Sequence, residues 1–131
     1  MKKNLFFAIL GLTVVLFTIS CSKNDTTPPN TTAEGKWVGI YTNFIGPSHY
    51  FAATFKVNSV ILIEANTIPD IANGTWSLSG DSVRATFTYV GGTAGTYSIA
   101  GKYSAGSTTM DGTIGLGTNT SGEAVFSFTK Q

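Results

Sequence analysis

The chain has 131 residues, of which 42% are hydrophobic and 11% are charged, and its formal net charge is +1. This length fits one domain, and the near-neutral balance leaves no basic stripe, so we expect no nucleic-acid partner. The single histidine, His49, and the single cysteine, Cys21, exclude a His/Cys metal cluster and an internal disulfide, and we expect no metal or cofactor.

Residues 1–20 have the composition of a secretory signal peptide. Lys2 and Lys3 precede an uncharged apolar run, and Ser20 and Cys21 follow it. A basic start, an apolar stretch of about 7–15 residues and a small residue before the cut define such a signal. A membrane-spanning helix needs a longer run of about 20 apolar residues. Cleavage after Ser20 leaves 111 residues with six basic and seven acidic side chains.

The position of Cys21 directly after the expected cut resembles bacterial lipoproteins, in which this thiol receives a diacylglycerol and the freed amine is acylated. Ser22, Lys23, Asn24 and Asp25 follow it and look like the export signal of certain Gram-negative surface lipoproteins, with Asn24 at one acidic position. Ser22 stands where an aspartate would imply retention in the inner membrane. The resemblance implies lipid anchoring to the outer membrane, and both the cell surface and the periplasmic face stay open.

The segment after Cys21 is polar. Residues 22–33 carry no large apolar side chain and include two adjacent prolines. Such a composition cannot bury enough surface to offset the entropy lost on ordering the chain. The sequence therefore predicts a lipidated, flexible tether over residues 21–33 and one domain over residues 34–131.

From Glu34 onward, apolar and polar side chains alternate with a period of two, and turn residues interrupt the pattern at short intervals. This alternation is typical of antiparallel strands with one face in water. The predicted strands span residues 35–42, 49–57, 60–65, 73–79, 82–90, 95–103, 108–116 and 123–130. Residues 60–63 are continuously apolar, so their inward face cannot be assigned.

Most aromatic residues fall on the apolar face of this alternation. They are Trp37, Tyr41, Phe51, Phe55, Trp76, Phe87, Tyr89, Tyr97, Tyr103, Phe126 and Phe128. Each ring can bury about 150–250 Å², and the sequence offers no helix to cover the face, so the sheet must close on itself or form a sandwich. Eight strands without a long crossing connection favour an all-β, antiparallel up-and-down barrel; a β-sandwich is the alternative.

The connections are expected to alternate between long and short. Longer loops at residues 43–48, 66–72, 91–94 and 117–122 would share one end of the barrel, the mouth, and tight turns would close the other. In such a meander the tether and the carboxy terminus both lie at the closed end. The mouth would then point away from the membrane.

Large apolar side chains in two of these loops, Phe44 and Ile45 and then Ile68 and Ile71, either mark a binding site or plug the mouth. His49 lies on the inward phase of its strand, where a ligand contact and a bond to backbone or water are both open. Tyr41 and Tyr89, whose side chains are expected to point into the barrel, are further candidates for ligand contact. The candidate ligand-binding residues are Phe44, His49, Ile68, Ile71, Tyr41 and Tyr89.

Catalytic constellations are missing from the sequence. A serine triad would need His49, and no Gly-x-Ser-x-Gly motif accompanies it. The acidic residues are scattered, and Glu64 and Asp70, which flank one expected loop, are interpreted as solvated charges. We therefore expect a protein that is not an enzyme.

The segment Gly35-Lys36-Trp37 opens the first strand of this eight-strand meander. Together with a last strand that pairs back on the first, it resembles the lipocalin-like (calycin-type) barrels over residues 34–131, and the resemblance implies that Trp37 packs the barrel base. We expect a monomeric, lipid-anchored protein that binds a small apolar or aromatic-stacking ligand. The alternative is a structural or interaction protein whose filled barrel contacts a partner protein or glycan through its loops.

Overall fold

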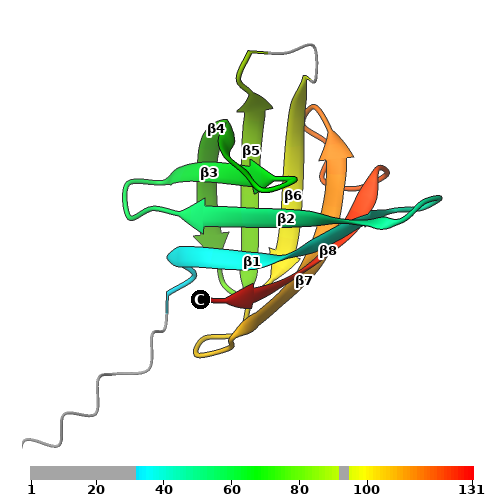
Figure 1. Ribbon diagram of the computed structural model, residues 1–131. Helices are drawn as coiled ribbons and strands as arrows, with labels where there is room; N and C mark the ends of the chain where they lie inside the picture. The colour runs from blue at the N-terminus through cyan, green and yellow to red at the C-terminus, as the bar shows by residue number, and fades with distance from the viewer. Residues whose placement is uncertain (1–31, 92–94) are drawn as a thin grey trace, which may run out of the picture.

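Eight strands alternate in direction along the chain and close into one antiparallel barrel (Figure 1). The structure is a computed structural model and describes residues 32–91 and 95–131; the signal peptide and the residues from Cys21 to Asp25 lie outside them. The strands are β1 Gly35–Asn43, β2 Ser48–Phe55, β3 Val60–Ala65, β4 Ile68–Ser79, β5 Ser82–Tyr89, β6 Thr96–Lys102, β7 Thr109–Leu116 and β8 Ala124–Lys130.

Each strand pairs with the next, and β8 pairs with β1 from Trp37↔Lys130 to Asn43↔Ala124. This last pairing leaves no free sheet edge and confirms the predicted up-and-down barrel over the sandwich. The described residues contain no helix long and apolar enough to cross a membrane.

The period-two alternation places the aromatic rings inside the barrel, as the sequence predicts. Seven of the eleven inward aromatic residues are fully buried in the core, and Tyr41, Trp76, Tyr89 and Tyr97 are partly buried and pack against it. In β3, whose inward face the sequence left open, Ile63 is among the side chains that point into the core. Burial of this apolar surface is the main stabilising term for the barrel.

Two inward glycines let neighbouring strands approach closely. A Cβ atom on Gly39 would lie 1.8 Å from the carbonyl oxygen of Ser127, and one on Gly74 would lie 1.9 Å from the carbonyl oxygen of Thr86. No side chain can occupy either position with the backbone in place. These glycines therefore allow the sheet to curl tightly around its core.

The connection between β3 and β4 differs from the long loop expected over residues 66–72. Asn66 and Thr67 have φ values of 50° and 64° and form a tight turn, so that β4 already begins at Ile68. The pairing register shifts shortly afterwards, near Asp70 (φ 51°). The prediction of a loop here is wrong, and three longer connections rather than four stand at the mouth.

The two ends of the barrel differ as expected. The start of β1 pairs with the end of β2, and the backbone N–H of Gln131 donates to the carbonyl oxygen of Lys36 at 2.9 Å, so both described termini lie at one end, the base (Figure 1). The β1–β2 loop and the turn at Asn66 lie at the opposite end, the mouth.

Residues immediately before β1 belong to the base. Ala33, assigned to the tether from sequence, is 0% exposed, and its carbonyl oxygen accepts a 2.7 Å hydrogen bond from the indole N–H of Trp37. The carbonyl oxygen of Thr32 accepts hydrogen bonds from Tyr103 at 3.0 Å and from Lys130 at 2.8 Å. The chain thus enters the barrel across its base.

Candidate functional site

A cavity of about 490 Å³ opens at the mouth of the barrel. Pockets for small ligands typically have volumes of about 300–1,000 Å³. Phe51 and Phe87, which are buried, form its floor, and the exposed Phe44 and Ile45 stand at its rim. The remaining lining residues are Tyr41, Asn43, Tyr89, Tyr97, Ile114, Gly122, Glu123 and Ala124.

Strand register brings the aromatic rings of the cavity together. Phe87 and Tyr89 are two positions apart on β5 and therefore share its inner face, and Phe87 pairs across the strands with Tyr97 of β6. The Tyr89 and Tyr97 rings lie 5.8 Å apart at 84°, and the Phe51 and Phe87 rings lie 6.3 Å apart. The last contact links β2 to β5 across the barrel and separates the cavity from the packed core below.

Three tyrosine hydroxyls add polar groups to these apolar walls. Within the described parts of the chain, the hydroxyls of Tyr41, Tyr89 and Tyr97 have no hydrogen-bond partner, and no buried side-chain polar atom is left without one. The three hydroxyls are therefore open to solvent. Burial, followed by the nearby Tyr41 and Tyr97, raises the pKa of Tyr89, so this hydroxyl is a neutral donor at physiological pH.

Glu123 is the one residue of charged type among the described residues that line the cavity, and it is exposed. Its backbone N–H donates to the carbonyl oxygen of Ile114 at 3.0 Å, which fixes the end of the β7–β8 loop beside the cavity. Its carboxylate forms no ion pair with the described residues. The mouth therefore carries a negative charge that no described cation pairs with.

The rest of the β7–β8 loop folds onto the outer face of the barrel rather than over the mouth. The Ser98 hydroxyl donates to the carbonyl oxygen of Gly117 at 2.7 Å, and the Thr113 hydroxyl donates to that of Thr120 at 2.6 Å. A Cβ atom on Gly115 would lie 2.5 Å from Ser121, so a glycine is needed under this loop. The longest mouth loop thus leaves the entrance open.

Three of the six candidate ligand-binding residues, Tyr41, Phe44 and Tyr89, line the cavity. His49 is not among the lining residues, but its ring stacks on that of Tyr41 with centroids 5.2 Å apart and planes 25° apart. His49 therefore positions the Tyr41 ring from within the barrel mouth.

The other two candidates, Ile68 and Ile71, belong to β4 instead of a loop and do not line the cavity. Ile68 is 54% exposed and Ile71 packs against the core. Phe44 and Ile45 are 68% and 95% exposed, so neither of them plugs the mouth. The interpretation of these side chains as a plug is therefore wrong for Phe44, Ile45 and Ile68.

Sequence reasoning missed Tyr97 and Glu123 as lining residues. Tyr97 was recognised as inward, and its place in the second position of β6, at the mouth end, is the signal that could have added it. Glu123 carried no such signal because its approach to the cavity depends on how the preceding loop folds.

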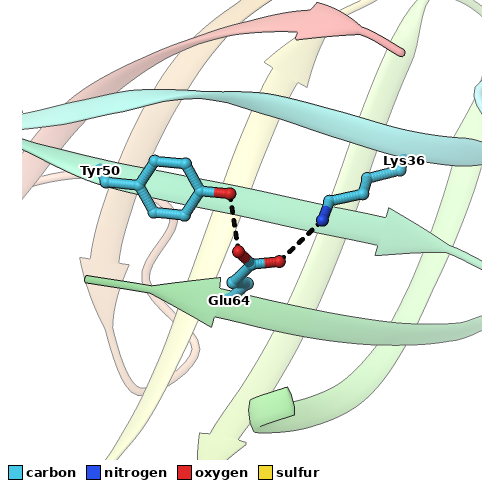
Figure 2. Close-up of polar contacts among 3 residues, drawn as sticks. All are labelled: Lys36, Tyr50 and Glu64. Atoms are coloured by element: carbon cyan, nitrogen blue, oxygen red, sulfur yellow. Dashed lines mark hydrogen bonds and ion pairs between the residues drawn. The ribbon is translucent and has the colours of Figure 1, made fainter. Parts of the chain in front are cut away.

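Glu64 and Asp70 do not meet His49 in a common site. Glu64 lies on the outer face, where Lys36 donates to its Oε2 and the Tyr50 hydroxyl donates to its Oε1, both at 2.8 Å (Figure 2). The hydrogen bond from Lys36 and then that from Tyr50 lower the pKa of Glu64. Over residues 32–91 and 95–131 there is no group of three His, Cys, Asp or Glu side chains that could hold a metal ion.

The fold and the site together define the chain as an eight-stranded β-barrel with an open, aromatic cavity at its mouth. Comparison with family models, with curated proteins and with solved structures finds no match.

Proposed function

We propose that this protein is a lipid-anchored binding module of the bacterial outer membrane, which holds a small apolar or aromatic-stacking ligand at the mouth of its barrel. The observation that carries the proposal is the cavity of about 490 Å³ with six aromatic side chains around it. A ligand seated there removes ring surface from water on both sides of the contact, which is the main source of affinity for apolar molecules.

The sequence of the amino terminus supports the anchoring half of the proposal. Two or more acyl chains give durable membrane attachment, at about 0.8 kcal/mol per buried CH₂. The twelve residues from Cys21 to Thr32, which are joined by eleven Cα–Cα steps, span at most about 40 Å when fully extended. Because the chain enters at the base, this attachment would hold the base toward the bilayer and the mouth away from it.

Cell fractionation tests the anchor. The full chain produced in a Gram-negative host should appear in the outer-membrane fraction, and its mature amino terminus should carry the mass of diacylglycerol plus an acyl chain. The Cys21→Ser chain should lose both properties. A Cys21→Ser chain that stays in the membrane fraction would contradict the proposed anchor.

Ligand binding is tested with a neutral aromatic probe. All strand pairs and the core lie within residues 32–131, so a chain that begins at residue 21 with Cys21→Ser keeps the whole barrel. N-phenyl-1-naphthylamine should bind this protein at one site with enhanced fluorescence. Tyr89→Ala should weaken binding about tenfold or more, since a ring face is lost, whereas Tyr50→Ala on the outer face should not.

Native mass spectrometry of the same protein, purified gently, then asks which small molecule it carries from the cell. A co-purifying molecule that is lost from the Tyr89→Ala protein supports the proposal. Failure of the naphthylamine to bind the unaltered protein would overturn it.

One observation favours a second function. Phe44 and Ile45 expose large apolar side chains at the tip of the β1–β2 loop, 68% and 95% exposed, where a partner protein or glycan could contact them. A photo-crosslinker placed at position 45 on whole cells tests this. A single, saturable crosslinked partner supports the interaction function, and its absence leaves only small-ligand binding.

A further inference from the structure

The rings at the mouth surround the cavity in different planes. Tyr41 meets Phe51 at 79° with centroids 5.6 Å apart, and Tyr89 meets Tyr97 at 84°. A flat platform would present parallel faces to a stacked ring. The rings around the cavity therefore do not form one flat platform, and a ring face that is open to the cavity presents the negative part of an aromatic quadrupole.

Charge is distributed unevenly between the two ends of the described barrel. The basic side chains lie in the base turns or within three residues of the base end of a strand: Lys36, Lys56, Arg84, Lys102 and Lys130. The acidic residues at the mouth end are Glu123, beside the cavity, Asp70, and Glu64, which pairs with Lys36. Glu34, Asp81 and Asp111 lie at the base end, where the basic side chains outnumber them.

Glu123 also differs from the paired carboxylates elsewhere on the described surface. Glu64 is bound by Lys36 at 2.8 Å and Asp81 by Lys102 at 3.0 Å, whereas Glu123 has no cation within reach among the described residues. An unpaired carboxylate beside neutral rings attracts a positive ligand and repels a negative one.

From these observations we infer that the mouth cavity selects an organic cation with apolar substituents on its nitrogen, of which a quaternary ammonium is the simplest case. The inference rests on the proposed function, since it names the ligand class of the same cavity. The ring faces receive the methyl groups and stabilise the charge, and the Glu123 carboxylate balances it. The hydroxyls of Tyr41, Tyr89 and Tyr97 are free to bond polar groups elsewhere on the ligand.

A matched pair of small molecules separates charge from shape. Choline and 3,3-dimethylbutan-1-ol have nearly the same size and shape, and only choline carries a positive charge. Each is used to displace N-phenyl-1-naphthylamine from the chain that begins at residue 21 with Cys21→Ser. A purely apolar pocket prefers the uncharged alcohol, because desolvating an ion is costly. We expect the opposite order, with choline binding about tenfold more tightly.

Single substitutions test which residues cause the expected preference for choline over the uncharged alcohol. Glu123→Gln keeps the size of an exposed side chain and should weaken choline about three- to tenfold while leaving the alcohol unchanged. Asp111→Asn removes a carboxylate from the base end of β7 and should alter neither compound. Tyr97→Leu should weaken choline more than the alcohol, because the apolar contact is kept and the π face is lost.

The possible outcomes distinguish the inference from the function on which it rests. Equal binding of the two compounds, preference for the alcohol, or displacement by neither overturns the cation inference; the proposed function survives as long as the naphthylamine binds. A preference for choline that Glu123→Gln and Tyr97→Leu leave unchanged overturns the assignment of these residues. Failure of the naphthylamine to bind removes the proposed function itself.

Discussion

On the outer face, the Glu64 carboxylate connects three neighbouring strands. Lys36 on β1 and Tyr50 on β2 both donate hydrogen bonds to this side chain on β3 (Figure 2). The bond with Glu64 raises the pKa of Lys36, and the bonds from Lys36 and Tyr50 lower that of Glu64. Because the folded state lowers the pKa of Glu64, its contribution to stability is present above the ordinary value of 4.5 and is lost as the pH falls.

We predict that Glu64→Gln removes the part of the pH dependence of folding stability that comes from Glu64. The variant should be less stable than the unaltered protein at about pH 7, and the difference should shrink toward about pH 3 as the falling pH drives protonation of Glu64. Urea unfolding at the two pH values measures it. Asp111→Asn is the control, because its carboxylate has no hydrogen bond or ion pair within the described residues. A difference that stays constant with pH would contradict the role given to Glu64.

The residues of the cavity were predictable from the sequence only where the alternation along a strand determines which way a side chain points. Tyr41 and Tyr89 are inward by alternation and line the cavity. The sequence predicts Ile68 within a loop over residues 66–72, yet this residue starts a strand. Thr67, a β-branched residue, adopts a positive φ that its type disfavours, so the turn before this strand had no clear sequence signal.

At the level of strands, the close approach of β1 to β8 depends on Gly39. The backbone of Ser127 occupies the position where a Cβ atom would lie, at 1.8 Å from the Ser127 carbonyl oxygen. Backbone cannot rotate away as a flexible side chain can. Any larger residue must push the two strands apart at the seam that closes the barrel.

We therefore predict that Gly39→Ala lowers the free energy of unfolding by about 3 kcal/mol, at the upper end of the usual cost of overpacking. Denaturant unfolding measures the loss. Ser127→Ala, which changes an exposed side chain and keeps the carbonyl group, should cost less than about 0.5 kcal/mol. Equal, small losses in the two variants would show that the strands separate without cost.

The short segment before β1 acts as part of the base. Ala33 is buried and its carbonyl oxygen accepts the Trp37 indole N–H, which a shorter chain would leave buried without this partner. A chain that begins at Glu34 should be less stable than one that begins at Thr32 by about 1–3 kcal/mol, the usual cost of such a lost bond. Thermal unfolding of the two chains compares them. Equal stability would show that the segment only rests on the surface.

For the whole molecule, the barrel was predictable because its cause is simple. A sheet with rings on one face and no helix to cover it must close on itself, and alternation fixed the direction of nearly every inward side chain. The positions of the mouth and the base were also predictable, because eight strands of alternating direction return the carboxy terminus to the end at which the chain enters. The cavity was not predictable in detail, because the fold of the β7–β8 loop onto the outer face depends on contacts made by Ser98 and Thr113.

Because the two ends of the barrel differ, the proposed ligand site and the proposed membrane anchor lie at opposite ends. The base is filled by packed side chains and by Ala33, while the mouth keeps an open cavity. The proposed ligand would therefore enter from the end opposite the described amino terminus, and the proposed lipid anchor would not compete with it for the same surface.

Amide chemical-shift mapping by NMR tests most directly whether the mouth is the binding site. The mature chain with Cys21→Ser is titrated with 2-naphthol, a soluble neutral aromatic molecule. We predict shift changes concentrated at the cavity, at Tyr41, Tyr97 and Glu123, with none at Trp37 or Ala33 in the base. Changes centred on the base, or spread evenly over the outer face, would contradict a ligand site at the mouth.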